Sequence, residues 1–508
     1  MKNIITKRQL LFVILVLLCG INPIYADTSK ELYVSDGNLS SLLPETERFK
    51  ITELTLSGEL NIYDLEVIRQ MGRCYKSYGS RYDGHLRYLD LSNATFVGDG
   101  TLKDSNGNIT LQLNYGRGNY LFEDMKSLHT IKLPNSMEEM GYSLFSGCDS
   151  LTSVTLPKSL KSMSLNFYNN GNLTSILIDD SNPYYSSDGS ALFDKYKRKM
   201  ILAVKTLKEY AIPSSVSEIS QSAFSYCRHL KTLVLPLRLK REKVYTSGFW
   251  DCDSLYSISV DEKNPYLCSD GSALYNKDKS ELVFVCHTVR KISIPSSVTK
   301  IGNYAFCKCT NLTSIELPSG VTSLESDAFT NCTNLSSLTL PSGVKYIGSS
   351  AFAHCKSLTS ITLPSGVENV WIYTFYGCES LKSITLPSDL KQIERDAFKD
   401  CNGLTSIYAF MKKPCEIQET TFDNETKINA TLYVPKGSLL NYWDDNQWNK
   451  FMNIEEFDAT SISSLNTNAN DVQEVSRYSD NGQRLKTPAK GLNIVKYNDG
   501  TVKKIMVK

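Results

Sequence analysis

The strongest constraint on the fold of this chain is a gapless internal repeat of 23 residues. Four consecutive copies begin at Leu312, Leu335, Leu358 and Leu381 and align position by position as far as residue 403. A 23-residue copy has too little apolar surface to bury on its own, so neighbouring copies must stack on one another. The repeat therefore predicts a solenoid of stacked coils. The same frame also begins at Ile51, Leu86, Leu128, Leu151, Leu173, Leu207, Leu230, Leu255, Val289 and Leu404.

Each copy combines one short strand with a turn and a second apolar pair. In the copy that begins at Leu358, apolar residues at offsets 3 and 5 alternate with polar residues, which is typical of a strand with one buried face. Pro364 then ends the strand because it has no amide hydrogen to donate to a neighbouring strand. Residues 349–352 (Ser-Ser-Ala-Phe) have the pattern of a helix start. We therefore expect an α/β repeat, a solenoid with one parallel sheet and short helices or turns on its back side.

Two of the copies are longer than the others and resemble each other. They span residues 173–206 and 255–288, and both contain Asn-Pro-Tyr followed by an Asp-Gly turn. Two apolar runs follow in each, and a pair of runs around a turn indicates a β-hairpin. We expect a hairpin insertion in each of these copies in place of the back-side helix.

The organisation along the chain follows from where the repeat begins and decays. Trp443, Trp448 and Phe451 come after the last regular copy, where large aromatic side chains would cover its open face. The expected segments are a signal peptide (1–26), an N-terminal capping region with divergent repeats (27–127), the regular repeats (128–410), a C-terminal repeat cap (411–459), a linker (460–475) and a β-rich tail (476–508).

The first 26 residues have the pattern of a cleavable secretory signal peptide. A basic start precedes an apolar run from Leu10 to Leu18, and small Ala26 precedes the expected cleavage point. The run is too short to span a bilayer, which needs about 20 residues. An uncleaved anchor and lipidation at Cys19 are the alternatives. We expect an exported chain, on the outer cell surface or secreted, with no transmembrane segment once the signal is removed.

The repeat consensus, L-P-S-G-V-x-x-I-x-x-x-A-F-x-x-C, resembles that of the BspA-like leucine-rich repeat family of exported Bacteroidales proteins. The resemblance covers about residues 50–458, including the closing segment LYVPKGSLLNYWDDNQW at 432–448. It implies a leucine-rich-repeat solenoid exposed at the cell surface and, in some members, adhesion to host matrix proteins or to other cells. It brings no catalytic residues with it. The tail from residue 480 to 508 resembles the C-terminal sorting domain used in Bacteroidetes secretion.

One cysteine recurs in most of the copies, three residues after an aromatic position. One cysteine per coil predicts a stacked row of small buried side chains that face the core. The alternative is a set of disulfides between neighbouring coils, since a coil spacing of about 5 Å lies within the Cα range for a disulfide. Side chains in such a row run parallel to one another, which favours free thiols. The row comprises Cys148, Cys227, Cys252, Cys309, Cys332, Cys355, Cys378 and Cys401.

Little in the chain points to catalysis, to a metal or to a nucleic acid. The 508 residues include only five histidines, and the net charge of +1 lacks the basic excess of a dedicated nucleic-acid binder. Cys307 and Cys309 form a lone C-x-C without a partner pair at zinc spacing, and the acidic loops at 179–180 and 261–262 lack the register of a calcium loop. The chain has no nucleophile elbow or phosphate loop. We expect no enzymatic activity, cofactor, metal or nucleic-acid partner.

The surface of the solenoid carries the remaining candidates for function. Outward strand positions hold a row of hydroxyl and carboxylate side chains, although β-propensity alone also places threonine on exposed strands. Exposed aromatic side chains in the insertions and in one coil form a rival set, which packing between coils explains equally well. The sheet-face candidates are Thr155, Glu316, Thr339, Thr362 and Thr385, and the aromatic candidates are Tyr184, Tyr185, Tyr266, Trp371 and Tyr373.

These features favour a binding or adhesion module as the function. The partner would be a host or bacterial protein, including extracellular matrix, or a glycan. A structural spacer in the cell envelope that binds nothing is the alternative. An enzyme acting on glycans or peptides is a third hypothesis, for which the sequence offers no site.

Overall fold

The computed structural model describes residues 28–35, 37–77, 80–103, 109–114, 117–164, 167, 170–458, 474–479, 484–485, 491–497 and 502–507. The chain forms two compact units, which meet in sequence at Val289 and Arg290 and are described in turn. The expected signal peptide lies outside the described residues, as does nearly all of the expected linker.

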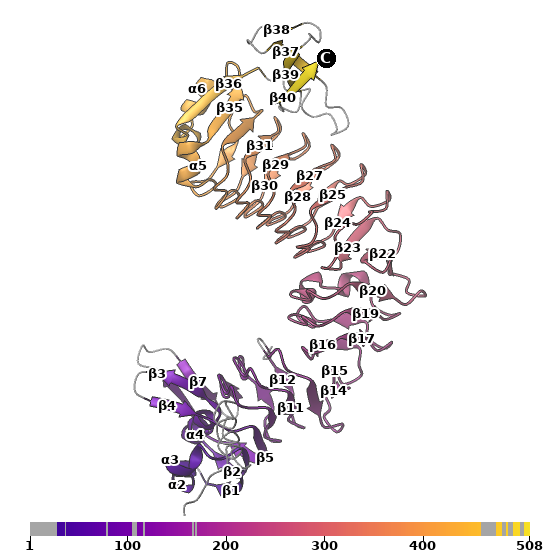
Figure 1. Cartoon of the computed structure of the whole chain (residues 1–508). Helices are drawn as coiled ribbons and strands as arrows, with labels where there is room; N and C mark the ends of the chain where they lie inside the picture. Colours follow the sequence, from indigo (N-terminus) through magenta and orange to yellow (C-terminus); the bar gives the residue numbers. More distant parts are fainter. Residues whose placement is uncertain are drawn as a thin grey trace, which may run out of the picture. The chain divides into compact units, whose positions relative to one another are not determined.

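The first sheet of unit 1 is a parallel array that begins with the divergent N-terminal copies (Figure 1). In-register pairing sets Leu32 beside Leu56, Leu54 beside Leu89, and Leu89 beside Ile131. The weak copies at residues 51 and 86 are therefore coils of the same sheet as the regular ones. Its strands, in spatial order, are β1 (Ser29–Val34), β2 (Glu53–Leu60), β5 (Tyr88–Phe96), β9 (Thr130–Lys132), β11 (Ser153–Leu156) and β13 (Ser175–Ile178).

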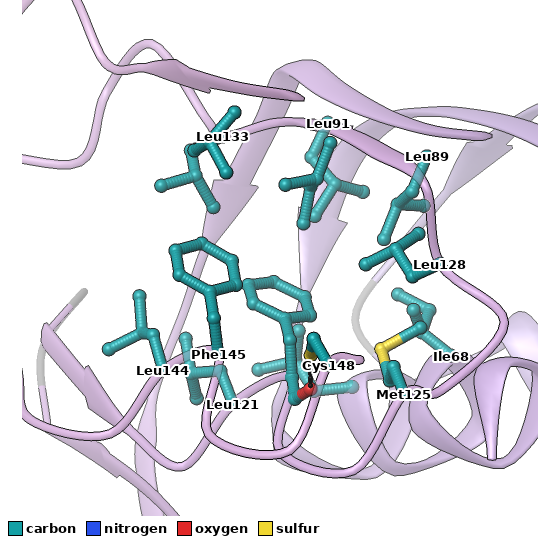
Figure 2. Close-up of a cluster of buried hydrophobic side chains, with 14 of the residues drawn as sticks. Ile68, Leu89, Leu91, Leu121, Met125, Leu128, Leu133, Leu144, Phe145 and Cys148 are labelled. Atoms are coloured by element: carbon teal, nitrogen blue, oxygen red, sulfur yellow. Dashed lines mark hydrogen bonds between the residues drawn. The ribbon is translucent and has the colours of Figure 1, made fainter. Parts of the chain in front are cut away.

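Helix α4 (Ile62–Gly72) packs on the core of this first sheet. It begins with a capping box, in which the Asn61 side chain accepts the amide of Asp64 and the Asp64 side chain accepts the amide of Asn61. Ile68 faces inward, and Figure 2 shows it in one buried cluster with Leu89 and Leu128. The neighbouring elements are α2 (Leu39–Leu42), α3 (Glu45–Arg48), β3 (Cys74–Ser77), β4 (Ser80–Asp83), β6 (Asp99–Lys103), β7 (Ile109–Asn114), β8 (Arg117–Asn119), β10 (Glu139–Met140) and β12 (Ser162–Met163).

Both expected insertions are β-hairpins. Leu192 pairs with Leu202 and Leu274 pairs with Phe284 in antiparallel register. The first insertion contains β14 (Tyr185–Ser187), β15 (Ala191–Asp194) and β16 (Lys199–Ala203), and the second contains β21 (Leu267–Ser269), β22 (Ala273–Asn276) and β23 (Glu281–Val285). The coils around them supply β17 (Glu209–Ala211), β18 (Glu218–Ile219), β19 (Thr232–Leu235), η1 (Arg241–Lys243), η2 (Thr246–Phe249) and β20 (Ser257–Val260).

Unit 2 contains the four gapless copies, which stack side by side as expected. Ser314 pairs with Ser337 and Ser360 with Ser383, in each case one repeat away, and the amide of Thr359 donates to the carbonyl of Ser336 between the two pairs. The fold is therefore a parallel-sheet solenoid with few helices. Its sheet strands are β25 (Ser314–Glu316), β27 (Ser337–Thr339), β29 (Ser360–Thr362), β31 (Ser383–Leu386), β33 (Ser406–Ala409), β35 (Thr431–Pro435) and β36 (Asn453–Phe457). Shorter strands follow the turn in each coil, namely β24 (Lys300–Ile301), β26 (Ser323–Leu324), β28 (Tyr346–Ile347), β30 (Asn369–Val370), β32 (Gln392–Ile393) and β34 (Glu416–Ile417).

A row of stacked phenylalanines forms the centre of unit 2. The rings of Phe329 and Phe352 are 5.4 Å apart and 5° from parallel, and those of Phe352 and Phe375 are 5.4 Å apart and 4° from parallel. Each ring is fully buried, which contributes about 1.5–3 kcal/mol per side chain relative to exposure. Because each ring stacks on rings of the neighbouring coils, a single coil cannot obtain this stacking.

The segments before each Ala-Phe pair are turns, so the expectation of a helix start at Ser349–Phe352 is wrong. Ser350 has a φ of 56° and His354 a φ of 59°, which is the left-handed region and cannot continue an α-helix. Amides here bond between coils, since Phe352 N–H donates to the Thr374 carbonyl at 2.8 Å and His354 N–H donates to the Tyr376 carbonyl at 2.7 Å. These inter-coil bonds replace the internal bonds of a helix and hold the strained residues in place.

The cysteine row lies beside the phenylalanines and is buried. The Cys355 thiol donates to the carbonyl of Phe329 at 3.3 Å, and the Cys378 thiol donates to that of Phe352 at 3.2 Å. Cys148 makes the same contact with Phe122 in unit 1, where Figure 2 shows it within the buried cluster. The eight cysteines of the row are free thiols, which agrees with the preferred interpretation. Each thiol therefore links one coil to the preceding one.

The end of unit 2 is closed by two buried aromatic side chains. The indole of Trp448 donates to the Cys415 carbonyl at 2.8 Å, and the Tyr442 hydroxyl donates to the Met411 carbonyl at 2.8 Å. Phe451 is buried as expected, but Trp443 is 53% exposed, so its expected role falls to Tyr442. The adjoining elements are α5 (Asn424–Asn429), α6 (Leu439–Trp443) and η3 (Trp448–Lys450).

The described tail residues form an antiparallel sheet, as the β pattern predicts. The spatial order of its strands is β38, β37, β39 and β40. The residues that connect these strands lie outside the described residues. The strands are β37 (Glu474–Ser479), β38 (Arg484–Leu485), β39 (Gly491–Tyr497) and β40 (Val502–Val507).

We predict that the buried cysteines do not react with iodoacetamide in the native protein. Burial raises the pKa of Cys332, Cys355 and Cys378 well above the ordinary value, so the reactive thiolate is scarce. Peptide mapping by mass spectrometry should find them unlabelled in buffer and fully labelled in urea without reductant. Half-buried Cys268 is the internal control and should label first. Row cysteines that stay unlabelled in urea until a reductant is added would instead indicate disulfides.

Candidate binding surface

The open face of the sheet in unit 2 carries a continuous line of outward side chains, here called the sheet-face row. Glu316 lies beside Thr339 on the neighbouring strand, and Thr362 lies beside Thr385. Alternate residues on the same strands, such as Ile361 and Ile384, point into the core. The structure therefore brings four of the five sheet-face candidates to one face, on four consecutive coils.

The sheet-face row continues into two tyrosines that the sequence reasoning missed. Thr385 lies beside Tyr408, which lies beside Tyr433 on the next strand. Their rings stack at 4.8 Å and 11°, and the Phe457 ring meets the Tyr408 ring edge-on at 6.3 Å. Partial burial raises the pKa of Tyr408, so its hydroxyl stays neutral and can donate a hydrogen bond. Thr385 is the fifth residue of its copy, and Tyr408 is the fifth residue of the copy that begins at Leu404, so the repeat frame could have identified this tyrosine.

The fifth sheet-face candidate, Thr155, lies in unit 1 on a surface of different character. It stands between Lys132 and exposed Leu177 on the neighbouring strands. Lys132 forms an ion pair with Asp90 at 2.7 Å, and this contact, with hydrogen bonds from Ser92 and Tyr88, holds the pKa of Asp90 below its ordinary value despite its partial burial. This face is charged and apolar, so Thr155 does not extend the hydroxyl row of unit 2.

The hairpin tyrosines are positioned by one buried asparagine in each insertion. The Asn264 amide donates to the carbonyls of Pro236 and Leu239 at 2.9 and 3.0 Å, and its oxygen accepts the amides of Tyr266 and Leu267. It thereby fastens the hairpin to the preceding coil and leaves the Tyr266 side chain exposed.

Asn182 has the same role in the first hairpin. It accepts the amides of Tyr184 and Tyr185, with exposed Tyr184 as the counterpart of Tyr266. The Asp-rich loops make turns, since Asp179 accepts the Ser181 amide. The asparagine of the Asn-Pro-Tyr motif therefore attaches each hairpin to the preceding coil.

The two remaining aromatic candidates lie on the turn side of unit 2. The ring of Trp371 packs against Tyr346 of the neighbouring coil at 6.3 Å. Exposed Tyr373 meets Tyr376 edge-on at 5.5 Å, and Tyr376 meets His354 edge-on at 5.0 Å. These contacts support packing between coils, and the structure does not join Trp371 and Tyr373 to the sheet-face row.

The described residues hold no cluster suited to metal binding. No group of three or more His, Cys, Asp or Glu side chains there could hold a metal ion. Burial lowers the pKa of His287 to about 4 and raises that of Cys286 to about 12, so neither group is poised for proton transfer at neutral pH. Among the helices in the described part of the chain, none has the length and apolarity to cross a membrane.

The geometry defines a leucine-rich-repeat solenoid with an open sheet face. The model of the BspA type leucine rich repeat region matches six copies, over residues 108–203, 194–271, 278–405 and 346–475. The chain therefore belongs to the BspA-type leucine-rich repeat family. No curated protein matches it in sequence.

Several solved structures are similar to this chain in fold. A leucine-rich repeat protein from Eubacterium ventriosum is 18% identical, with a TM-score of 0.42, covering 78% of this chain and 83% of its own. The pneumococcal vaccine antigen PcpA is 17% identical, with a TM-score of 0.46, covering 85% and 84%. A leucine-rich cell surface protein from Faecalibacterium prausnitzii is 21% identical, with a TM-score of 0.41, covering 62% and 86%.

We predict that Asn264→Ala detaches the second hairpin from the preceding coil. The change leaves two buried carbonyls and two amides without partners, which costs about 2–4 kcal/mol of unfolding free energy. Hydrogen exchange of the peptide that contains Leu267 should accelerate strongly. Asn276→Ala, which removes half-buried contacts within the hairpin, is the control and should have a smaller effect. Equal exchange in both variants would contradict the fastening role of Asn264.

Proposed function

We propose that this protein is an exported binding protein that grips a protein or glycan through the sheet-face row. The observation that carries the proposal is the alignment of Thr362, Thr385, Tyr408 and Tyr433 on one open face. Tyrosines offer a large contact area at low cost in side-chain entropy, and hydroxyls supply adaptable hydrogen bonds. A shallow face of this kind suits an extended partner held by many weak contacts.

Export and surface display are part of the same proposal. They are supported by the signal-peptide pattern of residues 1–26 and by the resemblance of the basic tail to a sorting domain. A Bacteroidales origin and a host extracellular-matrix partner follow from the resemblance stated above. We also propose that the regular repeats span 128–410 and that the C-terminal cap spans 411–459.

We predict that the triple variant Thr339→Lys, Thr362→Lys, Thr385→Lys abolishes capture of the partner. Three long cations on adjacent strands would replace short hydroxyls and block close approach to the face. The measurement is pull-down of purified matrix proteins, bacterial surface proteins and glycans by the mature protein, followed by titration of whatever is captured. Affinity should fall at least about tenfold, equivalent to about 1.4 kcal/mol.

The matched control places the same three charges three residues later in the same coils. Ser342→Lys, Ser365→Lys, Ser388→Lys changes exposed turn positions and should leave affinity within about twofold. Equal loss in both triples would point to a general charge effect, and unchanged capture by the threonine triple would exclude the sheet-face row. Absence of any captured partner would favour the envelope spacer.

A further inference from the structure

The two hairpins are copies within one chain, so comparing them separates shared structural residues from divergent ones. Lys195 and Lys277 occupy equivalent positions, and both donate to a main-chain carbonyl of the preceding loop, that of Asp180 at 2.6 Å and that of Glu262 at 3.3 Å. Their contacts recur because both hairpins need the same brace.

A second equivalent pair, Lys197 and Lys279, is also structural. Both have a left-handed backbone, with φ of 52° and 55°. Their ammonium groups lie over the rings of Phe193 and Tyr275, at 5.5 and 5.8 Å. A contact kept in both copies indicates a role in the hairpin turn itself.

The other tip positions diverge in charge. The first tip carries Tyr196, Arg198 and Lys199, where the second carries Asp278, Ser280 and Glu281. The tip at 194–199 therefore has four basic residues and one acidic residue, whereas the tip at 276–281 has two of each. Since both tips fold alike, the turn does not require this basic excess.

The basic surface continues from the first hairpin to the next coils. Lys199 of β16 and Lys243 of η1 reach the same carboxylate, that of Glu218, at 2.7 and 3.3 Å. These two ammonium groups hold the pKa of Glu218 below its ordinary value, so it stays ionised and neutralises only one of them. At the second hairpin, the residue equivalent to Lys199 is Glu281. Its carboxylate neutralises Arg241 through two contacts of 2.7 and 2.9 Å. Of the two hairpins, the first therefore keeps an excess of positive charge, which extends to Lys243.

Tyr196 gives this surface an exposed aromatic group. Its side chain is 73% exposed, and the Arg198 guanidinium lies 5.5 Å from its ring centre. The guanidinium covers one face of the ring, so the pair presents a fixed cation together with an aromatic edge. Arg198 is itself exposed and can bind an anion while it stays on the ring.

We infer that the basic hairpin patch, formed by Lys195, Tyr196, Lys197, Arg198, Lys199 and Lys243, binds a sulfated polysaccharide. Regularly spaced sulfates would complement several fixed cations, and the sugar ring offers an apolar edge to Tyr196. A nucleic acid fits less well, because a hairpin tip offers no helix to enter a groove and a single tyrosine, already covered on one face by Arg198, cannot stack a run of bases. The patch belongs to unit 1 and the sheet-face row to unit 2, so the inference does not depend on the proposed function.

The test transplants the second tip onto the first. Tyr196→Asp with Arg198→Ser inserts residues that the equivalent turn already accepts, so the hairpin should fold, and circular dichroism checks this. The probe is immobilised heparin at 0.15 M salt. The unaltered protein should bind and be released by salt, and the variant should bind about tenfold more weakly, through loss of charge-assisted contacts.

The matched control removes the same two units of charge from the other hairpin. Lys277→Gln with Lys279→Gln, which keeps a long side chain with a hydrogen-bond donor at both structural positions, should fold by circular dichroism and keep heparin affinity within about twofold. The threonine-to-lysine triple of the sheet face should also retain heparin binding, which separates failure of this inference from failure of the proposed function. Desulfated heparin should bind weakly.

Three results would overturn the inference. They are no binding of heparin by the unaltered protein, equal loss in the two hairpin variants, and tighter binding of duplex DNA than of heparin. The last result would assign the patch to nucleic acid.

Discussion

Stacking of each coil on its neighbours is the constraint on which the rest of this structure depends. Phe329, Phe352 and Phe375 lie in one column of nearly parallel rings, and each pair of rings contributes about 0.5–1.5 kcal/mol beyond the area it buries. The thiol of Cys355 bonds to the Phe329 carbonyl and so ties the same two coils together. Every such interaction joins one coil to the next, so stability comes from neighbouring pairs of coils.

The same constraint decides where function can reside. The inward positions and the turn side are committed to contacts between coils, as the bond from the Phe352 amide to Thr374 illustrates. Outward strand positions, and tip positions such as 196 and 198 that differ between the two hairpins, are not committed in this way, so their residues can differ without loss of the fold. Tyr408 stands where other copies have threonine, and Arg198 stands where the second hairpin has serine. Residues that depart from the repeat at outward positions are therefore the best candidates for contacts with a partner.

Much of the fold could be predicted from the sequence, because the apolar period, the paired runs of the hairpins and the buried cysteines are all periodic signals. The turns could not, since several left-handed positions are held by residues such as Ser350 and Tyr373, which have no intrinsic preference for that region. The choice of Tyr442 over Trp443 in the cap depends on tertiary packing. Of the site, the outward threonines of unit 2 were predictable. Tyr408 lies at the same offset as Thr385 in the copy that begins at Leu404 and so was predictable, whereas Tyr433 lies where the repeat decays.

The central claim is that the 23-residue coil is the unit of stability, and removal of one whole coil tests it most directly. Deleting residues 335–357 should bring Phe329 onto Phe375 and restore every contact between coils, whereas deleting 335–346 should set apolar positions against polar ones. The account predicts that the first variant keeps the circular dichroism per residue and cooperative unfolding of the full chain, and that the second loses both. Unfolding of both variants alike, or of neither, would contradict it.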